Sequence, residues 1–137
     1  MAKVSIEGLD AFFRDLNQKA ENLDRAARTI TVQSAAAVEG AAKRNFIGAH
    51  RRGMPHVGGN RPNVVTGQTR RSIITDPVRH SAPGMWETQV GPTVRWGRRL
   101  ELGLPPTRAF PYLAPGVAST EALRRSIAIT QWGRALA

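Results

Sequence analysis

The residue types that could support catalysis are few, and their spacing matches no common catalytic or metal site. His50 and His56 lie six positions apart, and His80 follows in a polar segment with Asp76 as its nearby acid. No H-x-x-x-H or H-E-x-x-H spacing occurs, and no pair of carboxylates suggests acid and base catalysis. Gly58 and Gly59 are not followed by the Gly-Lys-Ser/Thr of a phosphate-binding loop. We therefore expect no enzymatic activity, no cofactor or metal ion and no small-molecule substrate.

Arginine dominates the charge, with seventeen Arg against three Lys and a formal net charge of +10. Residues 1–47 hold seven basic and six acidic side chains, whereas residues 48–137 hold thirteen basic and four acidic ones, a net of +9. Such a surface attracts phosphate backbones or acidic protein surfaces, because the planar guanidinium group makes paired hydrogen bonds with either. A solvated basic face in a protein from an arginine-biased genome explains the charge equally well.

Length and composition indicate a single domain covering residues 1–137. The chain has no cysteine, so we expect packing or subunit contacts, and no disulfides, to stabilise it. Its apolar stretches are shorter than the roughly 20 residues needed to cross a bilayer. Lys3, Glu7 and Asp10 stand where a signal sequence would be apolar. We expect a soluble protein that is not exported.

The first third of the chain is expected to be mainly helical. After a short strand at Val4-Ser5-Ile6, the spacing of Leu9, Phe12, Phe13 and Leu16 predicts an amphipathic helix over about 8–20. The same period continues through an alanine-rich second helix over about 22–46. Small side chains allow close approach, so this helix should lie flat on a sheet or on a neighbouring subunit. Packing inside its own core is an equally good explanation.

The remaining two thirds predict an α+β fold with a small antiparallel sheet. Residues 48–62 lack periodicity and read as a long basic loop, one whose ordering can depend on assembly. Residues 72–75 and 85–90 predict two strands of a hairpin, linked through a polar stretch at 79–84. Residues 94–102 fit a helix or a strand. After Pro115 a C-terminal helix is expected, with Ser119 or Thr120 as its cap.

Two local features stand out in the basic part of the chain. In Thr66–Ile73, Gly67 can adopt the positive φ of a turn before a short helical turn, and Arg70 and Arg71 must point to different faces. A turn with solvated arginines is the simpler explanation for each residue alone. Glu101 is flanked by arginines at 95, 98 and 99. We expect it to pair with an arginine of the same chain or of the next subunit, which would add orientation more than stability.

Four signatures occur in order: Thr66–Ile73, Val90-Gly91-Pro92, Trp96–Gly103 with its Glu-x-Gly ending, and Phe110–Pro115. Together with an opening Ile6-Glu7-Gly8-Leu9 and a helix ending in Ala42-Lys43, they resemble the tail-completion and head-to-tail joining proteins of long-tailed bacteriophages. The resemblance covers essentially the whole chain. Trp96-Gly97-Arg98-Arg99 departs from it, since tyrosines are usual there, and Ala109-Phe110-Pro111-Tyr112 shifts the proline relative to the phenylalanine.

The resemblance implies a virion protein, made in the host cytoplasm, that forms a homo-oligomeric ring of six at the head-proximal end of the tail or in the neck. Its partners would be the adjacent connector and tail-tube proteins, with genome DNA passing through the ring and no membrane involved. Candidates for the subunit interface are Gly67, Arg70, Arg71, Trp96, Arg98, Arg99, Glu101, Phe110 and Tyr112. Candidates for lining the channel or contacting a neighbouring ring are His50, Arg51, Arg52 and Arg61.

Three other functions remain open. A tail terminator ring, which caps the tail tube, is a close neighbour within the same class. A basic nucleic-acid-binding module is the alternative of another class, although no helix-turn-helix or zinc-finger spacing occurs and Trp86, Trp96 and Trp132 form no evident stacking platform. A basic protein of the ribosomal or toxin type is the weakest alternative.

Overall fold

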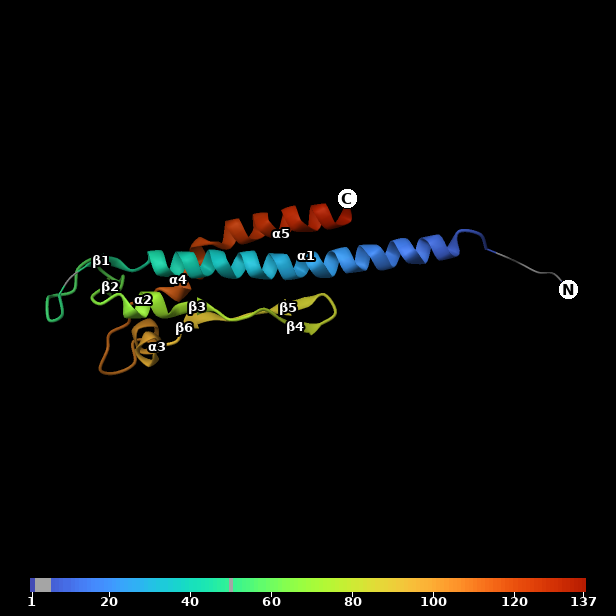
Figure 1. The fold of residues 1–137 in the computed structure, drawn as a ribbon. Helices are drawn as coiled ribbons and strands as arrows, with labels where there is room; N and C mark the ends of the chain where they lie inside the picture. The colour runs from blue at the N-terminus through green and yellow to red at the C-terminus, as the bar shows by residue number, and fades with distance from the viewer. Residues whose placement is uncertain (2–5, 50) are drawn as a thin grey trace.

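The computed structural model describes Met1, residues 6–49 and residues 51–137. The strand expected at Val4-Ser5-Ile6 falls largely outside these residues, and so does His50. The fold is α+β, as the sequence predicts, and it is built along one long helix (Figure 1).

Helix α1, Leu9–Arg44, runs the length of the molecule. The sequence predicts two helices here, and that prediction is wrong, because the residues between them, 20–22, contain neither glycine nor proline. The side chain of Asn22 accepts hydrogen bonds from Gln18 (3.1 Å) and Arg25 (2.6 Å) along the helix surface. Such pairs at helical spacing stabilise an uninterrupted helix through this segment. The C-terminal helix α5, Glu121–Leu136, lies beside α1 (Figure 1).

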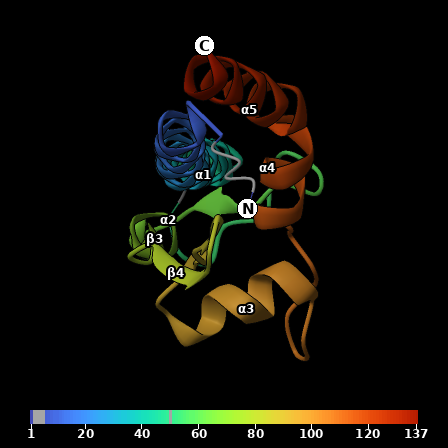
Figure 2. The ribbon, with the colours of Figure 1, turned by 90° about the vertical axis from the view of Figure 1, so that its right-hand side faces the viewer.

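On the side of α1 away from α5 lies a β-hairpin (Figure 2). It consists of two successive strand pairs. Strand β3, Ile73–Thr75, pairs antiparallel with β6, Val90–Pro92, and β4, Arg79–Ala82, pairs antiparallel with β5, Met85–Glu87. The segment 79–84, expected to be a link, thus contains a strand. The strand expected over 85–90 is divided, because residues 85–87 pair with β4 and the partner of β3 is residues 90–92. Two hydrogen bonds join the two arms of the hairpin between the strand pairs. Asp76 N–H donates to the Gln89 carbonyl (2.8 Å), and Thr88 Oγ1 donates to the Asp76 carbonyl (2.6 Å).

Polar contacts at three levels hold the hairpin to α1. Thr75 Oγ1 donates to Glu39 Oε2 (2.6 Å), and Thr31 Oγ1 donates to the Trp86 carbonyl (3.3 Å). Further along, Asp24 accepts from the Gly84 N–H (3.0 Å) and from Trp86 Nε1 (3.1 Å). Hydrogen bonds from Lys43 and Thr75 hold the pKa of Glu39 below its usual value. These contacts fix the register of the hairpin along the helix.

The apolar core lies at the C-terminal end of α1. Ala42, Phe46, Ile73 and Tyr112 form it. Helix α4, Leu113–Ser119, crosses α1 here, and its Gly116 approaches Ala42 so closely that a Cβ on Gly116 would lie 3.0 Å from the Ala42 nitrogen. The small residues of α1 therefore serve close packing within the chain.

The remaining elements are short. Strand β1, Ile47–Ala49, pairs parallel with β2, Asn63–Val64, so the predicted loop is irregular from residue 51 to 62. Helix α2 is Gln68–Ser72 and helix α3 is Arg95–Leu102. The segment 94–102, whose sequence fitted either a helix or a strand, is therefore helical. Thr120 stands at the start of α5 as predicted, but its hydroxyl donates to the Gly116 carbonyl (2.8 Å) and caps nothing in α5. The sequence did not predict α4.

The crossing of α4 over α1 gives the first testable prediction. Gly116→Ala would force the backbone of α1 away and should destabilise the protein by about 1–3 kcal/mol. A Cβ added to Gly133, in α5, would meet no atom within 4 Å, so Gly133→Ala should stabilise by about 0.5–1 kcal/mol through helix propensity. Urea denaturation followed by circular dichroism measures both. Equal effects of the two substitutions would contradict the close crossing.

Candidate functional site

Nine exposed arginines gather at the end of the molecule opposite the N-terminus, on the irregular loop, on α2 and α3 and on the connector that follows (Figure 1). None of them forms a salt bridge within the described part of the chain. We call this set the arginine surface, and it comprises Arg51, Arg52, Arg61, Arg70, Arg71, Arg95, Arg98, Arg99 and Arg108. Its positive charge is unbalanced inside the protomer.

The loop that carries three of these arginines is anchored to the connector after α3. The His56 ring stacks on Phe110, with ring centroids 4.0 Å apart, and Arg108 donates to Asn60 Oδ1 (3.1 Å). Within the loop, Asn63 Nδ2 donates to the Val57 carbonyl (2.7 Å). Phe110, an expected subunit-interface residue, thus has a contact within its own chain. These bonds set the direction in which Arg51, Arg52 and Arg61 project.

The turn at Thr66–Ile73 has the predicted conformation. Gly67 has φ +74°, and Thr66 Oγ1 accepts from the Gln68 N–H (3.2 Å) at the start of α2. Arg70 and Arg71 are both exposed. Trp96 Nε1 donates to Thr69 Oγ1 (2.9 Å), which ties α3 to α2. The expected interface residues on these two helices therefore lie on adjacent surfaces.

Glu101 does not pair with an arginine in the protomer, contrary to the expectation for the same chain. Its carboxylate accepts three backbone N–H groups at the start of α4, from Tyr112 (2.6 Å), Leu113 (2.9 Å) and Ala114 (2.9 Å). These donors have no partners inside α4, so the carboxylate of one helix caps another. Glu101 positions α4, and its acceptor oxygens are used within the chain.

Tyr112, another expected interface residue, lies wholly inside the protomer with 0% of its surface exposed. Its hydroxyl donates to the Gly97 carbonyl (3.0 Å), and its ring packs on Phe46 with centroids 4.9 Å apart. Burial raises the pKa of the hydroxyl well above its usual value, and the charge of Glu101 raises it further. Tyr112 is a core residue, and its place on the interface was wrongly predicted.

The four sequence signatures meet in space around Tyr112. Ile73, which ends the first, lies opposite Pro92 of the second in the β3–β6 pair. Gly97 of the third is buried so tightly against Pro92 that a Cβ would lie 2.6 Å from that ring, and Tyr112 of the fourth bonds to Gly97. Segments separated by many residues in sequence thus form one packed unit beneath the arginine surface.

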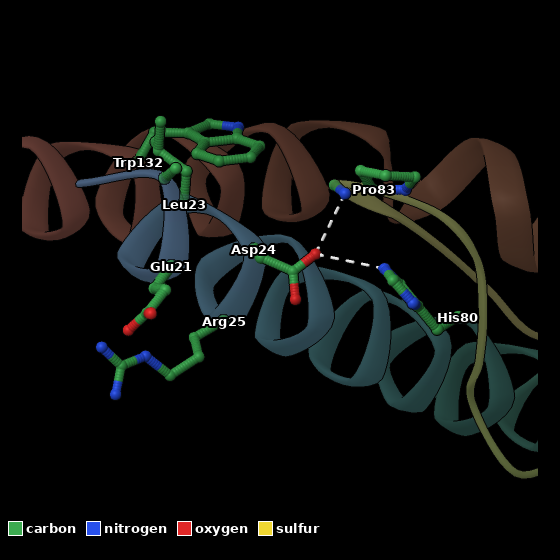
Figure 3. Close-up of a pocket in the computed structure, with 9 residues that line it drawn as sticks. Glu21, Leu23, Asp24, Arg25, His80, Pro83 and Trp132 are labelled. Carbon is green, nitrogen blue, oxygen red and sulfur yellow. Dashed lines mark hydrogen bonds and ion pairs between the residues drawn. The ribbon is translucent and has the colours of Figure 1, made fainter. Parts of the chain in front are cut away.

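A groove of about 670 Å³ lies between α1, α5 and the tip of the hairpin (Figure 3). Asp24 Oδ1 there accepts from Gly84 and Trp86 and lies 3.4 Å from His80 Nε2. Desolvation raises the pKa of Asp24, but hydrogen bonds from Trp86 and Gly84 and the nearby His80 outweigh it, so the net pKa is below its usual value. From the sequence we expected Asp76 to be the acid near His80, and we did not predict the contact with Asp24.

The chemistry of this groove is limited. Its lining includes no hydroxyl, thiol or lysine amine that could act as a nucleophile, and Asp24 is committed to holding the hairpin. Among residues 6–49 and 51–137, no cluster of three or more His, Cys, Asp or Glu side chains could hold a metal ion. We assign the Asp24 cluster a structural role.

Comparison of the chain with protein-family models, with characterised proteins and with solved structures gives no match. No helix in the described residues combines the length and hydropathy needed to cross a membrane.

The capping role of Glu101 gives the second prediction. Glu101→Ala leaves three N–H groups of α4 without an acceptor and should destabilise the protein by about 1–2 kcal/mol, as loss of a helix cap does. Glu87, exposed on β5 and without a side-chain bond in the described structure, is the control, and Glu87→Ala should change stability by less than about 0.5 kcal/mol. Thermal and urea unfolding measure both. A Glu101→Ala protein as stable as the control would contradict the capping role.

Proposed function

We propose that this protein is a structural subunit of a tailed-bacteriophage virion, forming a ring at the head-proximal end of the tail or in the neck. The single observation that carries the proposal is the convergence of the four ordered signatures on one packed unit around Tyr112. Motifs that resemble those of the tail-completion family thereby act together in one part of the fold. They support α2 and α3, from which most of the arginine surface projects.

Two further observations support assembly. The arginine surface has no acidic partner in the described protomer, so its charge is available to a second macromolecule. Few large side chains are fully buried, the largest being Tyr112, Ile73 and Pro62. A small core of this kind is suited to a chain that gains stability from subunit contacts.

The proposal is tested by mass and location. We expect sedimentation velocity and native mass spectrometry to show a closed oligomer of about six chains, since closed rings are a common outcome of head-to-tail contacts. We also expect the protein in purified particles. A strictly monomeric protein absent from particles would rule the proposal out. Deletion of the gene separates the two roles, because overlong tails indicate a terminator and tails of normal length without heads indicate tail completion.

The nucleic-acid-binding alternative is favoured by the same exposed arginines and gives the third prediction. If loop arginines face phosphate, changing Arg51, Arg52 and Arg61 to Gln should reduce the slope of log affinity against log salt by about 3, roughly one per arginine. Changing Arg125 and Arg134, exposed on α5, to Gln is the control and should leave the slope nearly unchanged.

Duplex binding at several salt concentrations distinguishes the two classes. Submicromolar affinity at physiological salt with several counterions released would favour a dedicated nucleic-acid-binding module. Weak, sequence-independent binding confined to low salt agrees with a ring through which DNA passes.

A further inference from the structure

The first part of α1 carries an apolar face that residues 6–49 and 51–137 leave exposed. Leu9, Phe12, Phe13 and Leu16 follow helical spacing and keep 42%, 56%, 53% and 45% of their surfaces exposed. Figure 1 shows this part of the helix extending beyond α5 and beyond the tip of the hairpin. We call residues 9–19 the α1 arm, which is roughly 16 Å long at 1.5 Å per residue. Apolar stripes of this kind are usually buried against another element.

The arm differs in charge from the strongly basic remainder of the molecule. Residues 9–19 hold two acidic and two basic side chains, a net charge of zero in a chain whose total is +10. With 3.6 residues per turn, Asp10 and Asp15 lie on the two sides of the apolar stripe. The arm therefore presents an apolar centre with Asp10 along one border and Asp15, together with Lys19, along the other.

A surface of complementary character lies at the other end of the molecule. A groove of about 780 Å³ is lined by three arginines of α3 and by apolar side chains that include Trp96 and Leu104. Arg95, Arg98 and Arg99 occupy positions i, i+3 and i+4 and so lie on one face of α3. Trp96 is 48% exposed and Leu104 is 39% exposed. We call this the α3 groove.

We propose that the α1 arm of one copy docks in the α3 groove of a second copy. The inference rests on the proposed ring, because it names the contact that joins its subunits. The arm and the groove lie at opposite ends of the elongated protomer (Figure 1), so one chain does not satisfy its own groove. The resulting contact is head-to-tail, the type that closes into a ring when the rotation between copies permits. Apolar side chains supply the buried centre, and the arginines pair with Asp10 and Asp15 at the rim.

Charge reversal on each surface tests the contact with the full-length protein. The arm variant carries Asp10→Arg and Asp15→Arg, and the groove variant carries Arg95→Glu and Arg99→Glu. Each places like charges across the contact, so each should raise the concentration needed for assembly by about 100-fold. All four side chains are exposed on the surfaces of their helices, so circular dichroism should show native folding of both variants.

The mixture of the two variants gives the sharper result. The reversed arm of one variant fits the reversed groove of the other, and the two remaining surfaces, a wild-type groove and a wild-type arm, also match. An equimolar mixture should therefore assemble into rings in which the two variants alternate, although each variant alone does not assemble. A chain carrying all four changes should also assemble like the wild type. Sedimentation velocity and native mass spectrometry distinguish these species.

Matched controls address the apolar part and the other basic helix. Phe12→Ala with Phe13→Ala should weaken assembly, whereas Ile129→Ala, at a residue 67% exposed on α5, should not. Arg125→Glu with Arg134→Glu reverses the same amount of charge on α5 and should assemble normally. If the α5 reversal prevents assembly as strongly as the groove reversal, or if the mixture assembles no better than either variant alone, the proposed contact is wrong.

The outcomes separate this contact from the ring itself. A wild-type oligomer that persists unchanged in the arm variant overturns the contact and leaves the ring intact. If that oligomer persists but the arm variant is lost from particles, another virion protein occupies the arm, which also overturns the proposal. A wild type that is monomeric at every concentration and absent from particles overturns both.

Discussion

The arginine end of this protein depends on the hydrogen bonds around one buried residue, Tyr112. Its N–H donates to Glu101 on α3, its carbonyl accepts from Asn45 Nδ2 at the end of α1 (2.8 Å), and its hydroxyl donates to the Gly97 carbonyl. A buried polar group without a partner costs about 1–3 kcal/mol, so these bonds are required as well as favourable. Through them α1, α3 and α4 take fixed positions relative to one another.

The position of α3 follows from the same constraint. Gly97 has room for no side chain between Pro92 and Tyr112, so α3 lies with this residue against the sheet. The faces of α3 that do not contact the core then carry its arginines outward. The arrangement of the arginine surface is thus a consequence of packing at Gly97 and Tyr112. By contrast, the first turns of α1 lie far from this core and have no comparable support within the described chain.

Patterns local in sequence predicted local structure well. The α+β class, the hairpin, the irregular basic loop, the positive φ of Gly67 and the C-terminal helix all follow from apolar spacing and turn residues. Contacts between distant segments were not predictable. Glu101 stands beside three arginines in sequence, but the fold brings the N-terminus of α4 to its carboxylate. In the sequence, Tyr112 and Phe110 are both aromatic residues next to Pro111 and cannot be told apart by pattern. The packing of α4 on α1 buries Tyr112.

The helix dipole accounts for some of the charged residues on the α1 arm and on α3 but not for others. Asp10 lies in the first turn of α1, where a negative charge stabilises the helix dipole, so its presence needs no partner. Asp15 lies beyond that turn and gains little from the dipole. Arg95 opens α3, where a positive charge is unfavourable by about 0.3–1 kcal/mol. The helix dipoles therefore explain neither Asp15 nor Arg95, and these two charges lie on the two surfaces that we propose to meet.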